Sequence, residues 1–343
     1  MMIHIDGSQG EGGGQILRTS LALSLLTNQP FEMVNIRLKR QQPGLRPQHL
    51  ASVKAAASIS KAEVVGAEPS STRLVFHPGE VHAGRYEFNI ATAGSTCLVL
   101  QTIYLPLSKA ASASNITITG GTHAPKSPSF EYLDQHWLRT LRLLGFDIHL
   151  DLIEAGFYPQ GGGKIQARIR PTPQTLELNL SQRGQLQQIR GVSAVANLDR
   201  RIAERQRNQV IHRLGDSYRL NDIRISELPS RFKGTFLLLL AEFEHSQACF
   251  FSLGALGKPA ERVADEAVDA LVEFLATDGA IDAYLADQLL LPLAYASSGS
   301  QLRTSRVSNH LLTNASVINT FHPNCIQIRG SYGEPGDIII HPR

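Results

Sequence analysis

The chain has few cysteines, and their spacing suits neither a metal centre nor a disulfide framework. Of its 343 residues only Cys97, Cys249 and Cys325 are cysteine, and no two form a C-x-x-C pair. Zinc sites and disulfide-stapled domains need several cysteines at short, regular spacings. We therefore expect neither feature, and we expect a protein of the reducing cytoplasm.

Long apolar runs are also missing. Stretches such as Phe236 to Ala241 are among the longest, whereas a helix that spans a membrane needs about 20 apolar residues. Residues Met1 to Asp6 have neither the basic segment nor the apolar run of a secretory signal. The sequence predicts a soluble, cytoplasmic protein without a membrane partner.

A large excess of charge is missing as well. The chain has 33 Lys and Arg against 30 Asp and Glu, and 42% of its residues are apolar. This is an ordinary globular composition, which allows a polyanionic partner without requiring one. The length fits one large or two ordinary domains with a substantial core.

The order of predicted elements repeats along the chain. Residues 2–76 and 85–168 both follow the order strand, helix, strand, helix, strand, strand, with a strand over 31–38 in the first copy and a helix over 129–144 in the second. A third copy is split: its first strand is 176–180, its helices are 283–296 and 309–321, and its last strands are 325–329 and 337–341. We predict an α+β fold built from three such α/β repeats in residues 1–184 and 281–343, with a small inserted α/β domain in residues 185–280.

A glycine-rich loop, DGSQGEGGGQILR, joins the first predicted strand to the first helix at Asp6 to Arg18. Bare backbone amides and a helix N-terminus suit phosphate. The loop is not a Walker A loop, because no Gly-Lys-Ser/Thr follows, and it is not a dinucleotide fingerprint, because Gln15 replaces the last glycine. A simple tight turn is the alternative. Glu11 would repel phosphate unless a cation bridged them, so the functional interpretation predicts a divalent ion there and a role for Arg18 at the same anion.

Other polar groups fall in predicted loops and helix starts. The basic stretch from Arg37 to His49 suits phosphodiester contacts, although a solvated loop explains it as well. Glycine loops at Gly120–His123 and Gly156–Gly163 end strands and are also compatible with simple hairpins. Tyr284 to Gln288 offers a ring and polar groups for a base, although helix capping explains Asp287. Five arginines on one inserted helix favour a solvated face over RNA contact, and these are Arg200, Arg201, Arg205, Arg207 and Arg213.

His310 opens a predicted helix that Ser308 or Asn309 caps. The buried face is expected to comprise Leu311, Leu312, Ala315, Val317 and Ile318. A neutral imidazole beside free backbone amides can attack phosphorus. For any single histidine a structural role is the simpler explanation, and spacing alone does not decide.

Six stretches together resemble the RNA 3′-terminal phosphate cyclase family. They occur in family order and are DGSQGEGGGQILRTSLALS, QPGLRPQHL, AGSTCLVLQT, GFYPQGGG, YLADQLLLPLA and HLLTN. The resemblance covers nearly the whole chain, the inserted domain least. It implies three repeats like the C-terminal domain of bacterial translation initiation factor three, with an insert in the third.

The resemblance also implies an activity. Such a ligase converts an RNA 3′-phosphate to a 2′,3′-cyclic phosphodiester with ATP, through a covalent histidine–AMP and an RNA(3′)pp(5′)A intermediate, releasing diphosphate and AMP. By motif position the histidine is His310. Mg²⁺ and Mn²⁺ both suit a single carboxylate, so the sequence does not choose between them.

Further site residues follow from the same resemblance. Glu11 and Arg18 are expected at the catalytic centre, with Glu11 near the metal. Arg40, Gln48 and His49 are expected to hold phosphates or the RNA end. The nucleotide is expected to contact the residues Gly12, Gly13, Gln101, Tyr284, Leu285, Ala286, Asp287 and Gln288.

Three other interpretations compete. A non-catalytic cyclase-like protein of ribosome biogenesis would lack the histidine nucleophile, which His310 disfavours. An enolpyruvyl transferase uses similar repeats, but it needs six of them and a longer chain. A lysine-type nucleotidyl transferase needs a Lys-x-Asp-Gly stretch, which is absent.

Overall fold

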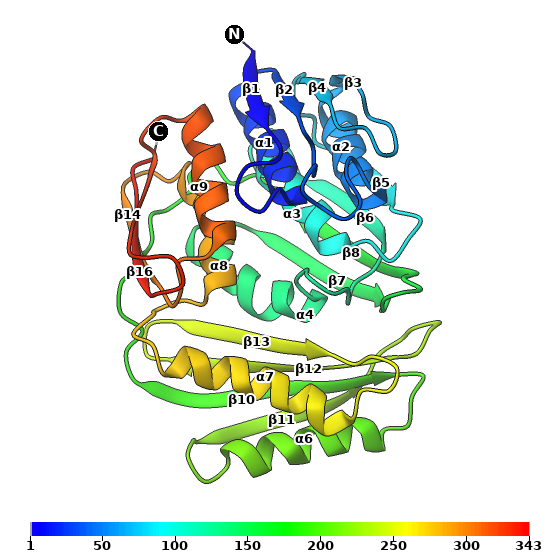
Figure 1. Cartoon of the computed structure of the whole chain (residues 1–343), viewed down its shortest axis with the longest axis vertical. Helices are drawn as coiled ribbons and strands as arrows, with labels where there is room; N and C mark the ends of the chain where they lie inside the picture. The colour runs from blue at the N-terminus through cyan, green and yellow to red at the C-terminus, as the bar shows by residue number, and fades with distance from the viewer. Residues whose placement is uncertain (1, 343) are drawn as a thin grey trace.

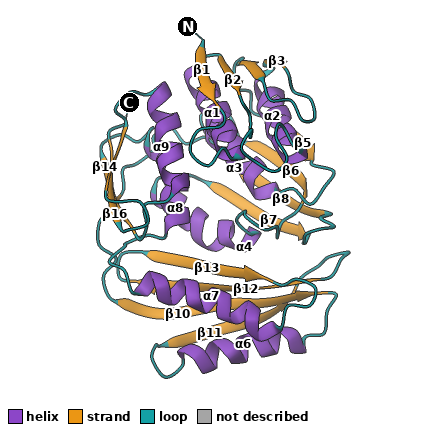
Figure 2. Cartoon of the chain, in the orientation of Figure 1, coloured by secondary structure: helices purple, strands orange, loops and turns teal. Residues whose placement is uncertain are grey.

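The protein is a mixed α/β structure, described for residues 2–342 by a computed structural model. Those residues form four four-stranded sheets with helices packed against them (Figures 1 and 2). None of the helices within residues 2–342 is long and apolar enough to cross a membrane.

The first sheet has the strand order β1-β2-β4-β3. Strands β1 (Ile3–Asp6) and β2 (Phe31–Val34) are parallel, and a helix, α1 (Gly14–Thr27), connects them. Strands β3 (Glu63–Val65) and β4 (Leu74–His77) complete the sheet in antiparallel pairing after α2 (Pro47–Ser60). Parallel neighbours need such a helical crossover, so this order brings α1 and α2 to one face.

Two further sheets have the same order of parallel and antiparallel neighbours. One contains β5 (Arg85–Asn89), β6 (Ser114–Gly120), β8 (Gly163–Ile169) and β7 (Ile148–Glu154), with α3 (Thr96–Ser108) as its first crossover. The other contains β9 (Asn179–Leu180), β14 (Ser300–Thr304), β16 (Gly336–Ile340) and β15 (Ile326–Arg329), with helices α8 (Ala283–Leu293) and α9 (Asn309–Phe321).

The fourth sheet lies in the segment that interrupts the third unit. Its order is β11-β10-β12-β13, from strands β10 (Leu186–Ala196), β11 (Leu220–Glu227), β12 (Gly234–Phe243) and β13 (Gln247–Leu253). Helices α6 (Arg201–Leu214) and α7 (Ala260–Leu275) cover one face. Alternate residues of β12 serve different cores: Leu237 and Leu239 pack towards α7, whereas Phe236 and Leu238 join the main hydrophobic cluster. Burial on both faces explains why β12 reads as a continuous apolar run.

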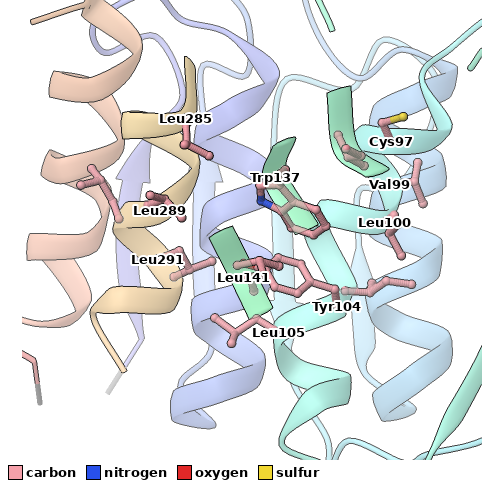
Figure 3. Packing of buried hydrophobic residues seen from close by; sticks show 14 of the residues in the cluster. Cys97, Val99, Leu100, Tyr104, Leu105, Trp137, Leu141, Leu285, Leu289 and Leu291 are labelled. Atoms are coloured by element: carbon pink, nitrogen blue, oxygen red, sulfur yellow. The ribbon is translucent and has the colours of Figure 1, made fainter. Parts of the chain in front are cut away.

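The main core lies between the helices of the three similar units. Tyr104 and Trp137 meet edge to face with ring centroids 4.8 Å apart, and Leu285 and Leu289 of α8 lie in the same cluster (Figure 3). Edge-to-face aromatic pairs add to the stabilisation from buried area. The core therefore fixes α8 close to α3 and to the second unit.

The structure departs from the predicted elements in one boundary, one internal irregularity and one omitted strand. The strand predicted over 31–38 ends at Val34, because Asn35 and Arg37 have left-handed backbone angles (φ of 55° and 54°) that form a turn. The helix predicted over 129–144 contains a π-helical turn at Leu133–Trp137 between α4 (Phe130–Tyr132) and α5 (Leu138–Leu143). Strand β14 was not predicted, because SQLRT is short and largely polar.

Candidate active site

His310 lies in the first turn of α9. Ser308 caps this helix, since its hydroxyl accepts a hydrogen bond from the Leu311 N–H at 3.1 Å. Most of the predicted apolar face is buried, but Leu312 is 39% exposed. The His310 side chain is 48% exposed. The fold thus presents the imidazole at a helix N-terminus, where anions are favoured.

Gln15 fixes the tautomer of His310. Its side-chain oxygen lies 2.8 Å from Nδ1 of the imidazole, and its side-chain nitrogen donates to the Asp287 carboxylate and to the His310 carbonyl oxygen. Because the amide nitrogen already faces two acceptors, the oxygen must face the ring and accept from Nδ1–H. In the neutral ring the lone pair is then on Nε2, which becomes the nucleophilic nitrogen.

Glu11 contacts the other nitrogen of the His310 ring. Its Oε2 lies 2.9 Å from Nε2 of His310 and 3.3 Å from Nη2 of Arg40. A carboxylate oxygen accepts hydrogen bonds, so this contact requires a proton on Nε2. The Glu11 contact occupies the nitrogen that Gln15 directs outwards, so Glu11 must move away before Nε2 can attack.

The glycine loop brings the start of α1 against α9. Gly10 has a φ of 53°, and a Cβ there would lie 2.0 Å from Oγ1 of Thr313 on α9. Only glycine fits this close approach in a left-handed conformation. Gly13 is the N-cap of α1, so no side chain satisfies the first amides of that helix. Two helix N-termini therefore meet beside His310, and both favour a bound anion.

The buried carboxyl group of Asp287 contacts Gln15, the residue that orients His310. Burial raises the pKa of Asp287 to about 6, and burial lowers the pKa of Arg18 to about 10. Asn314 donates to the carbonyl oxygen of Asp287 at 3.0 Å and accepts from Thr19 at 2.7 Å. Asp287 is not a helix cap, contrary to the structural alternative for this residue. Asp282 caps α8 by accepting from the N–H groups of Tyr284 and Leu285 at 3.0 and 2.9 Å.

His49 lies next to Arg18 and Gly14 as a buried, neutral donor. Its Nδ1 accepts the Arg46 N–H at 3.1 Å, so Nε2 bears the proton. Burial, with Arg18, Arg37 and Arg46 nearby, lowers the pKa of His49 to about 3. The ring therefore remains neutral above about pH 4 and can donate to an anion without adding charge.

The remaining predicted residues lie on α2, α3 and α8 and form a second wall of the site. Gln48 accepts a hydrogen bond from the Ser95 N–H at 2.7 Å, which ties it to the start of α3. Gln101 on α3 donates to Gln288 on α8 at 2.9 Å, and Tyr284 is 60% exposed. Leu285 and Ala286 are buried in the core, so their side chains do not face solvent at this wall.

Comparison with known proteins decides the family. The sequence profile described as RTC, RNA 3′-terminal phosphate cyclase, matches residues 9–328. The chain belongs to the RNA 3′-terminal phosphate cyclase family. It is 42% identical to the RNA 3′-terminal phosphate cyclase of Nostoc punctiforme over 93% of this chain and 94% of that one. It is also 42% identical to the cyclase of the same name from Caldivirga maquilingensis, over 99% and 98% of the two chains.

One solved structure aligns along the whole chain at a low score. The enolpyruvyl transferase NikO from Streptomyces tendae matches with a TM-score of 0.41 and 8% identity, covering all of this chain and 48% of that one. A likeness this weak carries no conclusion.

A metal in this cyclase-family site would rest mainly on Glu11. Within residues 2–342 no group of three or more His, Cys, Asp and Glu side chains is placed to hold an ion. Mg²⁺ sites often use one carboxylate together with substrate phosphates, so a single Glu11 beside an anion-binding loop fits that chemistry. The ion would neutralise phosphate charge when bound.

The arginines of α6 are largely engaged in ion pairs. Arg205 pairs with Glu261 at 2.7 Å, and Arg213 pairs with Asp265 and Asp269 at 2.8 Å, so these cations join α6 to α7. Sequence reasoning missed Gln15 as a site residue. The only signal was its departure from the glycine fingerprint, which gives no indication of a partner in α9.

Proposed function

We propose that the protein converts an RNA 3′-terminal phosphate to a 2′,3′-cyclic phosphodiester with ATP, using His310 as the nucleophile. The observation that carries the proposal is the Gln15 contact, which leaves Nε2 as the attacking nitrogen beside two helix N-termini. Relatives named RNA 3′-terminal phosphate cyclase, 42% identical over nearly the whole chain, support the same reaction.

In the first step Nε2 attacks the α-phosphorus of ATP. An N–P bond forms, and the bond from the α-phosphorus to the bridging oxygen breaks, which releases diphosphate. The proton on Nδ1 stays in place, donated to the Gln15 oxygen, and that oxygen stabilises the positive charge that develops on the ring.

In the second step the RNA 3′-phosphate takes AMP from the histidine. A phosphate oxygen attacks the phosphorus, the N–P bond breaks, and RNA(3′)pp(5′)A forms as His310 regains its lone pair. The adjacent 2′-hydroxyl then attacks the RNA phosphorus and expels AMP. AMP is a good leaving group, and the neighbouring hydroxyl reacts within one molecule at little entropic cost.

The side chains around His310 divide into three groups. Gln101, Tyr284, Asp287 and Gln288 hold the nucleoside, with Leu285 and Ala286 as the buried support of that wall. Gly12 and Gly13 present backbone amides to phosphates, and Glu11 would hold the divalent ion. The RNA end takes its contacts from Arg40, Gln48 and His49, with Arg18 behind them.

We also propose a repeat architecture with an inserted domain. The three sheets with matching strand order are repeats of one unit like the C-terminal domain of translation initiation factor three, in residues 1–184 and 281–343. Residues 185–280 form the inserted domain. The place of action is the cytoplasm, where RNA ends and ATP are available.

A non-catalytic cyclase-like protein is the alternative, and an end-product assay separates the two. A short RNA with a 3′-phosphate is incubated with ATP and Mg²⁺, and the terminal phosphate is tested for resistance to phosphatase. We expect resistance with the wild type and full sensitivity with His310→Ala. A wild type that leaves the phosphate sensitive would contradict the proposed activity.

A further inference from the structure

The loop between β7 and β8 carries an exposed aromatic side chain that the proposed adenylation step does not use. It comprises residues Gly156–Gly163, GFYPQGGG, and it exposes 64% of the Tyr158 side chain. An exposed aromatic ring offers a flat face on which a nucleic-acid base can stack.

The backbone of this loop is fixed on both sides of Tyr158. Before it, Phe157 is buried and stacks on His123 with ring centroids 4.5 Å apart, and the Tyr158 N–H donates to the His123 carbonyl oxygen at 3.2 Å. After it, Gly161 has a φ of 70°, and a Cβ there would lie 2.7 Å from Cα of Ala93. The tyrosine is therefore displayed on a rigid base.

A second exposed ring lies beside the same loop. Phe232, 39% exposed, is in the connection between β11 and β12 of the inserted segment, and a Cβ on Gly162 would approach its ring to 3.0 Å. The connection is tied to the end of β7, since Ser230 donates to the Ala155 carbonyl oxygen and the Ala155 N–H donates to Pro229, both at 2.7 Å. Tyr158 and Phe232 are thus held in fixed relation to each other.

Exposed cations lie close in sequence to the residues of this region: Lys233 directly follows Phe232, and Lys126 comes three residues after the His123 that stacks on Phe157. Lys126 and Lys233 are exposed, and neither forms an ion pair within residues 2–342. Arg231 contacts Glu154 at 3.0 Å but remains 76% exposed. The arginines that join α6 to α7 differ, because acidic partners already neutralise them. We call Lys126, Tyr158, Arg231, Phe232 and Lys233 the aromatic strip.

Direct contacts connect the aromatic strip to the adenylation site. Gln48, next to His49, accepts from Ser95, and a Cβ on Gly94 would lie 3.0 Å from Cβ of Gln48. Gly161 then packs on Ala93, and Gly162 packs on Phe232. These contacts form a continuous chain of packed residues from Gln48, next to His49, to Phe232 of the strip.

We infer that the nucleotides preceding the RNA 3′ end lie across the aromatic strip, with bases stacked on Tyr158 and Phe232 and phosphates near Lys126 and Lys233. This inference rests on the proposed function. Aromatic stacking suits single-stranded RNA of any sequence, because every base has a flat face. Exposed cations beside the rings match the phosphate backbone, which a neutral apolar partner would not need.

RNA length tests the inference. For the wild type we expect a 3′-phosphorylated RNA of about ten nucleotides to have a lower KM than one of two nucleotides. Tyr158→Ala or Phe232→Ala should raise the KM of the long RNA about 5- to 100-fold, as lost stacking predicts. The KM of the short RNA, kcat and the rate of adenylation by ATP alone should stay the same, and Tyr158→Phe should restore long-RNA affinity.

Salt dependence tests the cations. Lys126→Gln and Lys233→Gln should each reduce the slope of log affinity against log salt by about 0.7 for single-stranded RNA. Arg205→Gln is the matched control in the inserted segment, and it should leave the slope unchanged because Glu261 already pairs with that arginine.

Equal KM values for long and short RNA in the wild type would overturn the inference. An unchanged KM for long RNA in the variant that combines Tyr158→Ala and Phe232→Ala would also overturn it. That result would indicate that the strip binds a protein partner instead. Binding of a ten-nucleotide RNA with a 3′-hydroxyl, followed by fluorescence anisotropy, tests the strip without catalysis. Failure of the proposed function is distinct, because it would appear as no cyclisation of RNA of either length.

Discussion

Gln15 and His310 lie 295 positions apart in the chain, yet the Gln15 oxygen accepts a hydrogen bond from Nδ1 of the imidazole at 2.8 Å. The contact joins the first helix of the first unit to the last helix of the third. It decides which ring nitrogen is the nucleophile, so the chemistry depends on how the two ends of the chain pack together.

Gln15→Leu tests that relationship. Without the acceptor, the ring is free to place its neutral proton on either nitrogen, and the lone pair is no longer directed outwards. We expect adenylation to slow by about 10²- to 10⁴-fold, the range seen when a catalytic histidine loses the group that orients its tautomer. Quench-flow with labelled ATP measures this rate. Gln9→Leu, in the exposed part of the same loop, should remain as fast as the wild type, and a Gln15→Leu rate within threefold of it would refute the assignment.

Glu11→Ala should affect adenylation more than RNA binding. Glu11 contacts Nε2 of His310 and Arg40 and is the proposed carboxylate for the divalent ion, whereas RNA affinity rests largely on other groups. We expect adenylation to fall about 10²-fold and to need more Mg²⁺, with the Kd for RNA changed by less than about threefold. Glu68→Ala is an exposed control. Equal losses in adenylation and RNA binding would exclude the metal role.

The depressed pKa of His49 predicts a pH effect on stability. Its folded-state pKa is about 3 and its ordinary value is 6.5, so the unfolded chain binds the proton more readily between these values. Stability is then fully present above about pH 6.5 and falls by about 1.4 kcal/mol per pH unit as pH drops towards 3. His49→Gln should flatten this part of a urea-unfolding series against pH. His4→Gln, at an exposed histidine, should follow the wild type, and a parallel curve for His49→Gln would contradict the buried neutral ring.

The cysteines should be unreactive in the folded protein. All three are buried, and burial raises the pKa of Cys97 to about 12 and that of Cys325 to about 11. A thiol that stays protonated is a poor nucleophile. Titration with an aromatic disulfide at pH 8 should show negligible release until the protein is unfolded, and Cys97→Ser should retain activity within about threefold. Rapid modification with loss of activity would show that a thiol takes part in the reaction.

Local patterns were enough to place most helices. The bounds 309–321 predicted for the helix of His310 agree with α9, because a serine cap and an apolar repeat lie close together in the sequence. Strand β14 was missed, since its burial comes from neighbours in β9 and β16 that are distant in sequence. The turn after Val34 was also missed, because left-handed Asn35 and Arg37 follow an apolar alternation that reads as strand.

The site was predictable only in part. The family resemblance indicated His310, Glu11 and Arg18 by position, and the structure brings Glu11 to the imidazole. Gln15 was not predicted, because a glutamine at a helix start has no local signature for its role. Asp282, rather than Asp287, caps α8, and only the hydrogen-bond geometry separates these two carboxylates.

The most direct test of the central claim is covalent labelling of the protein by ATP. The wild type is incubated with α-labelled ATP and Mg²⁺, denatured, and examined for label on the chain. The account predicts a bond that is labile in acid and stable in alkali, as a phosphoramidate is, present in the wild type and absent in His310→Ala. No label on the wild type with either Mg²⁺ or Mn²⁺, or undiminished label on His310→Ala, would contradict it.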